Sequence, residues 1–461
     1  MTASTIGFSL LVLGVLLAIG KWLRVKIELF QNLFLPSSII AGFVGLLLGP
    51  EVLGKLNFIE GAGIFTENML EVWGNLPGLL ISVVFASLFL GNNIPNLKKV
   101  WDLAGPQITL GYVYSLGQYV IGLLLVFIFL GPVFGVDPMA GSLIEIGFVG
   151  GHGTAAGMAE TFEKLGFAAG APMAMGMATI GILGGVVIGM FLINWGVRNN
   201  KSKVIDQVHD KNAIQKKGVV KEEKRKSAGK LTTSPESIEP LSLHFAYIAM
   251  AILIGIGFLE FFKWIEASTW GAATDVFLFR YVPLFPLAMI GGIIVQMISD
   301  KKDPYHTIDK GLISRIQGFA LDLLIVSALS TLNLSLIGEN IIPFLTLALG
   351  GTLWTVFVFL FLSPKILRSY WFERGVGDFG QSMGVTATGL MLMKVADPDN
   401  ETPALESFGY KQILFEPIMG GGLFTAASVP LIYQFGGVGV FIVLAIAMIL
   451  LLLFGLFGFK K

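Results

Sequence analysis

The chain alternates long apolar stretches with short polar connections. About 20 consecutive apolar residues suffice to cross the hydrocarbon core of a bilayer as a helix. By this measure about eleven stretches are long enough, or nearly long enough, to span a membrane. We expect these helices at residues 4–23, 33–49, 76–94, 105–131, 171–196, 242–262, 276–298, 314–337, 341–363, 409–434 and 437–458.

The composition agrees with this pattern. Of the 461 residues, 54% are hydrophobic and 13% are charged, and the mean hydropathy is +0.78. Soluble domains carry about 25% charged residues, so the chain is expected to be an all-α polytopic membrane protein that lies in a lipid bilayer. The formal net charge is zero, which gives no sign of nucleic-acid binding, and the absence of cysteine excludes disulfides and thiol chemistry.

One long polar segment divides the chain. Residues 198–240 carry 11 Lys and Arg residues and 6 Asp and Glu residues, with no apolar periodicity. Such a composition is typical of a flexible linker. Its basic residues could also bind a partner or anionic lipid, although a solvated linker is the simpler interpretation. We therefore expect a first membrane region at 1–197, the linker at 198–240, a second membrane region at 241–435 and an additional C-terminal helix at 436–461.

The distribution of basic residues predicts the orientation. Basic residues follow the first apolar stretch and no cleavage site is visible, so that stretch is interpreted as a membrane helix and not as a signal peptide. Cytoplasmic loops are enriched in Lys and Arg, and placing the linker inside brings nearly every basic cluster to the same side. This places the N-terminus outside and the C-terminus in the cytoplasm. The clusters are Lys21, Arg24, Lys26, Lys98, Lys99, Lys301, Lys302, Lys310, Arg315, Lys365, Arg368, Arg374, Lys460 and Lys461.

Weak internal similarity relates the two membrane regions. Five helices precede the linker, so the second region starts from the opposite side of the membrane and any repeat must be inverted. Four segments match in the same order, which predicts two five-helix halves of an inverted-repeat secondary transporter plus one extra C-terminal helix. The matched pairs are 33–45 with 283–295, 78–90 with 318–330, 147–158 with 377–390, and 178–187 with 415–424.

Each half also contains one segment that is too polar and glycine-rich to span, at about 138–165 and about 375–396. We expect both to be re-entrant hairpins whose tips approach the bilayer midplane. Paired interruptions in inverted halves are the best sequence indication of a transporter's binding site. Bare backbone is tolerated at that depth only inside protein or beside a water-filled cavity. Exposed N–H groups attract carboxylates, and exposed carbonyl groups can hold Na⁺.

Three motifs resemble one family. The stretch "GSLIEIGFVGGHGTAAGM" resembles the first hairpin of the sodium/glutamate symporters, whose mark is Gly-Gly-His-Gly-Thr. "LPSSIIAGFVGLLLG" and "ATIGILGGVVIGMFL" are similar to that family's second and fifth helices. In the second hairpin Gly384, Thr386, Thr388 and Met393 match, whereas Ser382 replaces a glycine, Ala387 the proline and Leu392 the asparagine.

The resemblance implies Na⁺-coupled uptake of glutamate or a related anionic substrate across a bacterial inner membrane, by a homodimer with an elevator-like motion. Na⁺ would be the coupling ion and no other cofactor is expected. The implied substrate-binding residues are Gly150, Gly151, His152, Gly153 and Thr154 in the first hairpin, and Ser382, Met383, Gly384, Thr386 and Thr388 in the second.

Carboxylates at membrane depth are functional hypotheses by default. Four acidic residues are candidates for holding Na⁺ or carrying a proton, and a buried ion pair is the alternative for each. Lys394 closes the second hairpin and could pair with one of them or meet the substrate. His152 could be a metal ligand or a proton relay, but its isolation favours a neutral, hydrogen-bonded tip residue. The acidic candidates are Asp378, Glu416, Glu145 and Asp322.

Three classes of function are compatible with a polytopic chain. A secondary transporter explains the interruptions, the repeat and the charge pattern together. A channel would need a continuous pore, and an enzyme would need a catalytic constellation that the scattered histidines do not supply. Within the transporter class, an H⁺- or Na⁺-coupled carrier of another carboxylate, such as a 2-hydroxycarboxylate, remains an alternative to glutamate transport.

Overall fold

Helix is the dominant element of the computed structural model, which describes residues 2–33, 35–55, 62–92, 97–204, 217–220, 222–225, 227–274, 276–398 and 401–459 and contains no strand within them. Nine helical spans in this part of the chain are long and apolar enough to cross a membrane. The prediction of an all-α polytopic membrane protein is therefore confirmed. The spans are Ala3–Lys26, Ser37–Lys55, Glu67–Ala86, Val100–Phe134, Gly170–Arg198, Pro240–Ser268, Lys310–Ser330, Ile341–Ile366 and Gly437–Phe457.

The largest differences between the expected and the observed helices occur at three places. The helix expected at 76–94 is α4 (Glu67–Ala86), which begins earlier because the Thr66 hydroxyl caps it by accepting a hydrogen bond from the Met69 N–H. The helix expected at 276–298 is α14 (Phe285–Lys302), which has a proline in its first turn, where a missing N–H is tolerated. The single span expected at 409–434 was wrong.

In that last region the structure contains two short helices, α20 (Ala404–Phe415) and α21 (Leu423–Phe435). Between them Gly420 and Gly421 have φ angles of 67° and 100°, which a continuous right-handed helix cannot contain. The chain therefore bends where hydropathy alone predicted one span.

The helices form two compact units. Unit 1 comprises residues 1–94, 156–160 and 211–335, and unit 2 comprises residues 95–155, 161–210 and 336–461. Each unit thus takes helices from both sides of the linker. The other elements of unit 1 are α1 (Ala3–Lys26), α2 (Glu28–Asn32), α3 (Ser37–Leu48), η1 (Leu53–Lys55), η4 (Glu222–Lys224), α12 (Pro240–Ser268), α13 (Trp270–Thr274) and α15 (Lys310–Ser330).

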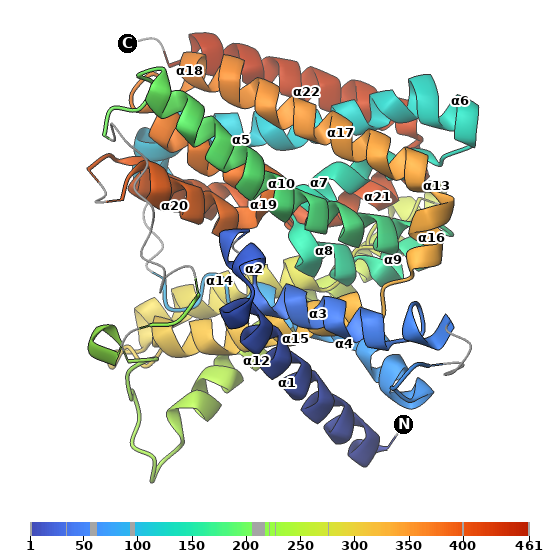
Figure 1. Ribbon diagram of the computed structural model, residues 1–461, viewed down its shortest axis with the longest axis vertical. Helices are drawn as coiled ribbons and strands as arrows, with labels where there is room; N and C mark the ends of the chain where they lie inside the picture. Colours follow the sequence, from blue (N-terminus) through green and yellow to red (C-terminus); the bar gives the residue numbers. More distant parts are fainter. Residues whose placement is uncertain are drawn as a thin grey trace. The chain divides into compact units, whose positions relative to one another are not determined.

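Most of the remaining elements belong to unit 2, and Figure 1 labels the α-helices. The elements are α5 (Leu97–Leu125), η2 (Val126–Leu130), α6 (Gly131–Phe134), η3 (Pro138–Ser142), α7 (Leu143–Phe148), α8 (Gly151–Gly157), α9 (Ala159–Lys164), α10 (Gly170–Arg198), α16 (Leu334–Glu339), α17 (Ile341–Phe357), η5 (Val358–Leu362), α18 (Ser363–Ile366), α19 (Trp371–Ala396) and α22 (Gly437–Phe457).

Part of the expected linker contacts unit 1. Residues 205–216, 221 and 226 lie outside the described part of the chain. Of the rest, the Gly218 carbonyl accepts a 2.6 Å hydrogen bond from Lys21 Nζ at the end of α1. The Lys230 N–H donates to Asp309 Oδ1, which lies just before α15, at 3.2 Å. These contacts anchor the end of the linker that leads into α12.

Small residues bring α12 and α14 together in unit 1. A Cβ atom on Gly255 of α12 would lie 2.6 Å from the Ala288 backbone nitrogen of α14, and a Cβ atom on Gly291 of α14 would collide with the Ala251 carbonyl. The two contacts are reciprocal, so each helix presents small residues to the backbone of the other. Close backbone approach of this kind is a main source of helix association in lipid.

We expect Gly255→Val to lower the melting temperature of the purified protein, because the added side chain would collide with backbone atoms that cannot move aside. Overpacking of this type costs about 1–3 kcal/mol. Gly257→Val is the matched control on the same helix, since a Cβ atom there meets nothing within 4 Å. Equal melting temperatures for the two variants would contradict this account of the contact.

Candidate functional site

The first glycine-rich segment is broken at its centre. It runs through η3, α7, α8 and α9 (Figure 1), and the helix is interrupted between α7 and α8. Gly151 has a φ of 70° at this point, a conformation that glycine adopts without steric cost. His152 follows and is buried, and its Nε2 lies 3.0 Å from Thr179 Oγ1 of α10. The histidine is therefore held by a hydrogen bond at the break.

The second segment is also broken, inside α19. Gly384 (φ −148°, ψ 49°) and Val385 (φ 63°, ψ 169°) interrupt the helical backbone. Val385 lies in a region of backbone space that is essentially restricted to glycine, and such a residue costs about 1–3 kcal/mol. Strain of this size persists only where the surroundings impose it, and it concentrates at functional sites.

The two breaks meet within unit 2. A Cβ atom on Gly151 would collide with Cγ1 of Val385, so the backbone of the first break lies directly against the side chain of the second. The two residues that have positive φ in these segments are thus neighbours, although more than two hundred residues separate them in the chain.

A glycine face on α10 supports the second break. Gly181, Gly185 and Gly189 recur every fourth residue and therefore lie on one face of the helix. A Cβ atom on Gly181 would collide with the Met383 carbonyl oxygen, and one on Gly185 would lie 3.2 Å from Thr388 Cγ2. We call these three residues the α10 glycine face. It allows the backbone of α19 to approach α10 at Met383 and Gly384, and beyond the break it accommodates the side chains of Thr388 and Leu392.

Unpartnered polar atoms gather beside the breaks. Gln118 of α5 donates from Nε2 to the Ser382 carbonyl at 2.7 Å, just before the second break. Its Oε1 has no hydrogen-bond partner among the described residues, nor have His152 Nδ1 and Thr154 Oγ1, and all three atoms are buried. Buried polar atoms are normally satisfied, so three such atoms near the meeting breaks are suited to holding a polar ligand.

Glu145 of α7 is fully buried and accepts three hydrogen bonds. Tyr119 Oη donates to Oε2 at 2.6 Å, while the Gly420 N–H and Thr425 Oγ1 donate to Oε1 at 2.9 and 3.0 Å. The donors come from α5, from the bend between α20 and α21, and from α21. The carboxylate therefore fixes α7 to that bend.

Asp378 and Glu416 belong to one polar network. Lys411 Nζ of α20 lies 2.7 Å from Asp378 Oδ1, and both side chains are completely buried. Thr386 Oγ1, just after the second break, donates to Glu416 Oε1 at 3.1 Å. The ammonium group that pairs with Asp378 is thus Lys411, whereas Lys394, which the sequence suggested for such a pair, is exposed.

The structure brings most of the predicted site residues into unit 2 but not all of them. Asp322 is exposed on α15 and belongs to unit 1, so it does not share a unit with the other acidic candidates. Sequence reasoning missed Gln118, Gln381 and Lys411. Only Lys411 had a usable signal, since a lysine within an apolar stretch is unusual, and the two glutamines are recognised by their contacts alone.

A second pair of irregularities precedes the broken segments. Val126–Leu130 ("VFIFL") and Val358–Leu362 ("VFLFL") are both π-helical, and each is followed at once by a short helix with a proline in its first turn. The Gly131 N–H donates to the Val126 carbonyl and the Ser363 N–H to the Val358 carbonyl. A proline has no N–H to donate to the carbonyl four residues earlier, and its ring clashes with that carbonyl. The helix therefore widens by one residue in the preceding turn.

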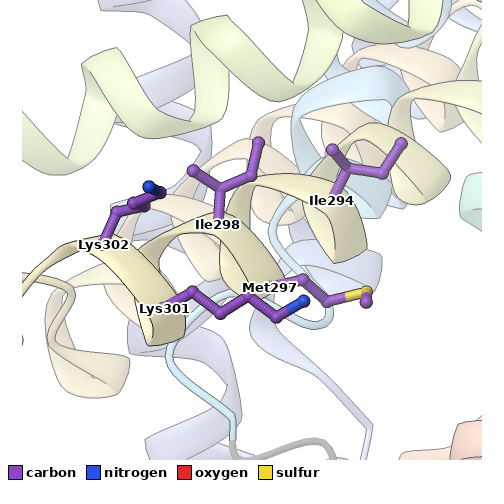
Figure 2. Close-up of a pocket in the computed structure, with 5 residues that line it drawn as sticks. All are labelled: Ile294, Met297, Ile298, Lys301 and Lys302. Carbon is purple, nitrogen blue, oxygen red and sulfur yellow. The ribbon is translucent and has the colours of Figure 1, made fainter.

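The pocket drawn in Figure 2 lies on α14 in unit 1 and is lined by apolar side chains and two lysines. Its described lining consists of Ile294, Met297, Ile298, Lys301 and Lys302, so no side-chain oxygen faces it and it does not suit Na⁺. In Figure 2 Lys301 extends along the helix toward Met297, whereas Lys302 points away from it. Among the described residues there is also no group of three His, Cys, Asp or Glu side chains that could hold a metal ion.

The fold and these breaks define a polytopic membrane protein with interrupted helices, a class that includes many secondary transporters. Residues 4–397 match the family described as "Sodium/glutamate symporter". The chain belongs to this family, as its motifs predicted, and the family implies sodium symport and glutamate transport. No curated protein matches the chain in a sequence search.

We expect Gly181→Ala to destabilise the protein, because the added methyl group would push the Met383 carbonyl and with it the start of the break. The expected cost is about 1–3 kcal/mol, observed as a lower melting temperature. Gly184→Ala is the matched control, since its Cβ atom would meet only the flexible ends of the Met383 and Ile188 side chains, at 3.1 and 3.8 Å. A larger effect at Gly184 than at Gly181 would refute the role of the α10 glycine face.

Proposed function

We propose that this protein takes up glutamate, or a closely related anionic substrate, across a bacterial inner membrane together with Na⁺. The observation that carries the proposal is the contact between the two helix breaks, where Gly151 meets Val385 beside buried polar atoms that have no partner among the described residues. The binding residues proposed are Gly150, Gly151, His152, Gly153 and Thr154 from the first break and Ser382, Met383, Gly384, Thr386 and Thr388 from the second.

These groups suit a carboxylate-bearing substrate. The second half of α19 begins at the break, so its first N–H groups carry the partial positive charge of a helix N-terminus. Thr154 Oγ1 and Gln118 supply neutral hydrogen-bonding groups. Glycine at 150 and 151 leaves the backbone accessible to the ligand. An anion can be held in this way without a lysine or arginine in direct contact.

Oxygen atoms for Na⁺ are available near the same place. Na⁺ is a hard cation that in transporters is coordinated by carbonyl, hydroxyl and carboxylate oxygens, and carbonyl groups released at helix breaks are a common source. Thr386 and Glu416 are adjacent to the second break, and Asp378 precedes it, with its Oδ1 paired with Lys411 Nζ. Glu145 and Asp322 remain weaker proposals because the first is occupied by three donors and the second belongs to unit 1.

Two features support an inverted repeat, and a third supports transport by one of the two units. The two π-helical segments have nearly the same sequence and precede the two broken segments in the same order. The matched prolines Pro36 and Pro286 both stand at the start of a helix, α3 and α14. Both breaks belong to unit 2, as expected if one unit carries the substrate. A homodimer with an external N-terminus and a cytoplasmic C-terminus completes the proposal.

The second break favours testing other carboxylates. Ser382 and Leu392, which replace a glycine and an asparagine of the family pattern, are both buried, so these replacements alter the interior near the break. A 2-hydroxycarboxylate carried with Na⁺ or H⁺ is therefore the second candidate. A channel is disfavoured because the described residues around both breaks are close-packed.

We expect the affinity for glutamate to increase with Na⁺ concentration, and the affinity for Na⁺ to increase with glutamate by the same factor. Couplings of this kind are typically about 5- to 150-fold. The measurement is ligand-induced thermal stabilisation of the purified protein in NaCl and in choline chloride, with malate and citrate tested in parallel. Equal stabilisation by glutamate in both salts would reject Na⁺ coupling. Stabilisation by malate or citrate but not by glutamate would show that the substrate is a hydroxycarboxylate instead of glutamate.

We expect Thr154→Val to weaken substrate binding while the melting temperature without ligand stays close to that of the wild type. The change removes the Thr154 hydroxyl, which has no hydrogen-bond partner among the described residues, and keeps the side-chain shape. A hydrogen bond to a charged group is worth about 1.5–3 kcal/mol, so binding should weaken by roughly 10- to 150-fold. Thr154→Ser keeps the hydroxyl and should restore binding. Unchanged affinity in Thr154→Val would exclude this hydroxyl from the site.

A further inference from the structure

Lys411 is the feature of unit 2 that the binding site does not explain. Its side chain is completely buried on α20, and Nζ donates to Asp378 Oδ1 and to Gln381 Oε1, both at 2.7 Å. The aromatic rings of Phe415 and Phe408 lie 4.6 and 5.3 Å from the ammonium group. Oxygen atoms and aromatic faces are the surroundings that a desolvated cation requires.

Hydrogen bonds lead from this ammonium group to the second break. Gln381 Nε2 donates to Thr386 Oγ1 at 3.0 Å, and Thr386 Oγ1 donates to Glu416 Oε1 at 3.1 Å. Gln381 and Gln412 also exchange hydrogen bonds of 2.9 and 3.2 Å. Gln381 precedes the break and Thr386 follows it, so the network spans the interruption of α19 and ties both sides to α20.

The position of the ammonium group resembles that of a bound cation. It contacts one carboxylate oxygen and one amide oxygen, which are ligands that Na⁺ also accepts. Asp378 Oδ2 is buried and has no hydrogen-bond partner among the described residues. Without the lysine, Asp378 would be a buried carboxylate that has lost its main counter-charge. Its remaining partners, Gln107 and the buried Arg374 guanidinium, act on it more weakly, so the site would favour uptake of a cation from solution.

We infer that Lys411 is a resident cation: its ammonium group occupies a position that would otherwise take up Na⁺, and it thereby sets how many Na⁺ ions accompany the substrate. This inference rests on the proposed Na⁺-coupled function. Lys411 acts as a positioning residue, because it reaches the break through Gln381 and Thr386 and does not touch the breaks' backbone contact at Gly151 and Val385. Removal of the ammonium group should therefore change the Na⁺ dependence of substrate binding and not only the stability of the protein.

The test compares Lys411→Met with the wild type. Glutamate affinity is measured by thermal stabilisation at pH 8 over a range of Na⁺ concentrations, with choline keeping the ionic strength constant. The slope of log affinity against log Na⁺ concentration reports the ions taken up with the substrate. We expect the slope to rise by about one in Lys411→Met and to return to the wild-type value in the double variant D378N/K411M, which removes both charges. An unchanged slope in Lys411→Met overturns the inference.

Two further variants keep the test decisive. Lys263→Met removes a lysine from an exposed ion pair with Glu260 on α12 and should leave the slope unchanged. If Lys411→Met does not fold, Lys411→Gln removes the same charge but keeps a hydrogen-bonding group that can reach Asp378, and it should raise the slope by about one in the same way. An unchanged slope in Lys411→Gln overturns the inference.

The slope measured for the wild type distinguishes failure of the proposed function from failure of the inference about Lys411. A wild-type slope of zero would reject Na⁺ coupling and with it the proposed function, whereas a slope that appears only in Lys411→Met would still support the resident cation. A positive wild-type slope that no variant changes would retain the proposed function and reject the inference.

Discussion

The close approach of α10 to the broken helix α19 is the constraint on which the site depends. The α10 glycine face offers no side chains, so the α19 backbone comes within contact distance at Met383 and Gly384. Beyond the break, the side chains of Thr388 and Leu392 pack against the same face. Apolar burial gives little driving force between helices in lipid, and close packing has to replace it. The α10 glycine face therefore both associates the two helices and holds a strained residue, Val385, in place.

Polar groups then determine what the breaks can do. A helix that stops inside a membrane leaves N–H and C=O groups that require partners, and in unit 2 these are met by side chains from other helices. Gln118 donates a hydrogen bond to the Ser382 carbonyl, and Glu145 accepts one from the Gly420 N–H. The hydroxyl of Thr154 and the Nδ1 atom of His152 have no partners among the described residues, and for this reason both residues are proposed as substrate-binding residues.

The buried pair of Lys411 and Asp378 adds an ion pair to this arrangement. A buried ion pair is weak evidence for stability, because the loss of hydration offsets much of the attraction between the charges. Hydrogen bonds connect the pair through Gln381 to Thr386. Because these two residues lie on opposite sides of the break, the pair is linked to the interrupted part of α19. The charge of Asp378 in the second broken segment is thus compensated by α20, a helix that follows this segment in the chain.

The sequence by itself determined the membrane class, the two interrupted segments and the family, because hydropathy, glycine content and a local motif are properties of consecutive residues. It did not determine the bend between α20 and α21, since the apolar run continues through Gly420 and Gly421 and only their φ angles end the helix. Nor did it identify Lys411 as the partner of Asp378 in place of Lys394. That choice depends on which helix packs against α19, and it is made by contacts between segments distant in the chain, which composition and periodicity do not record.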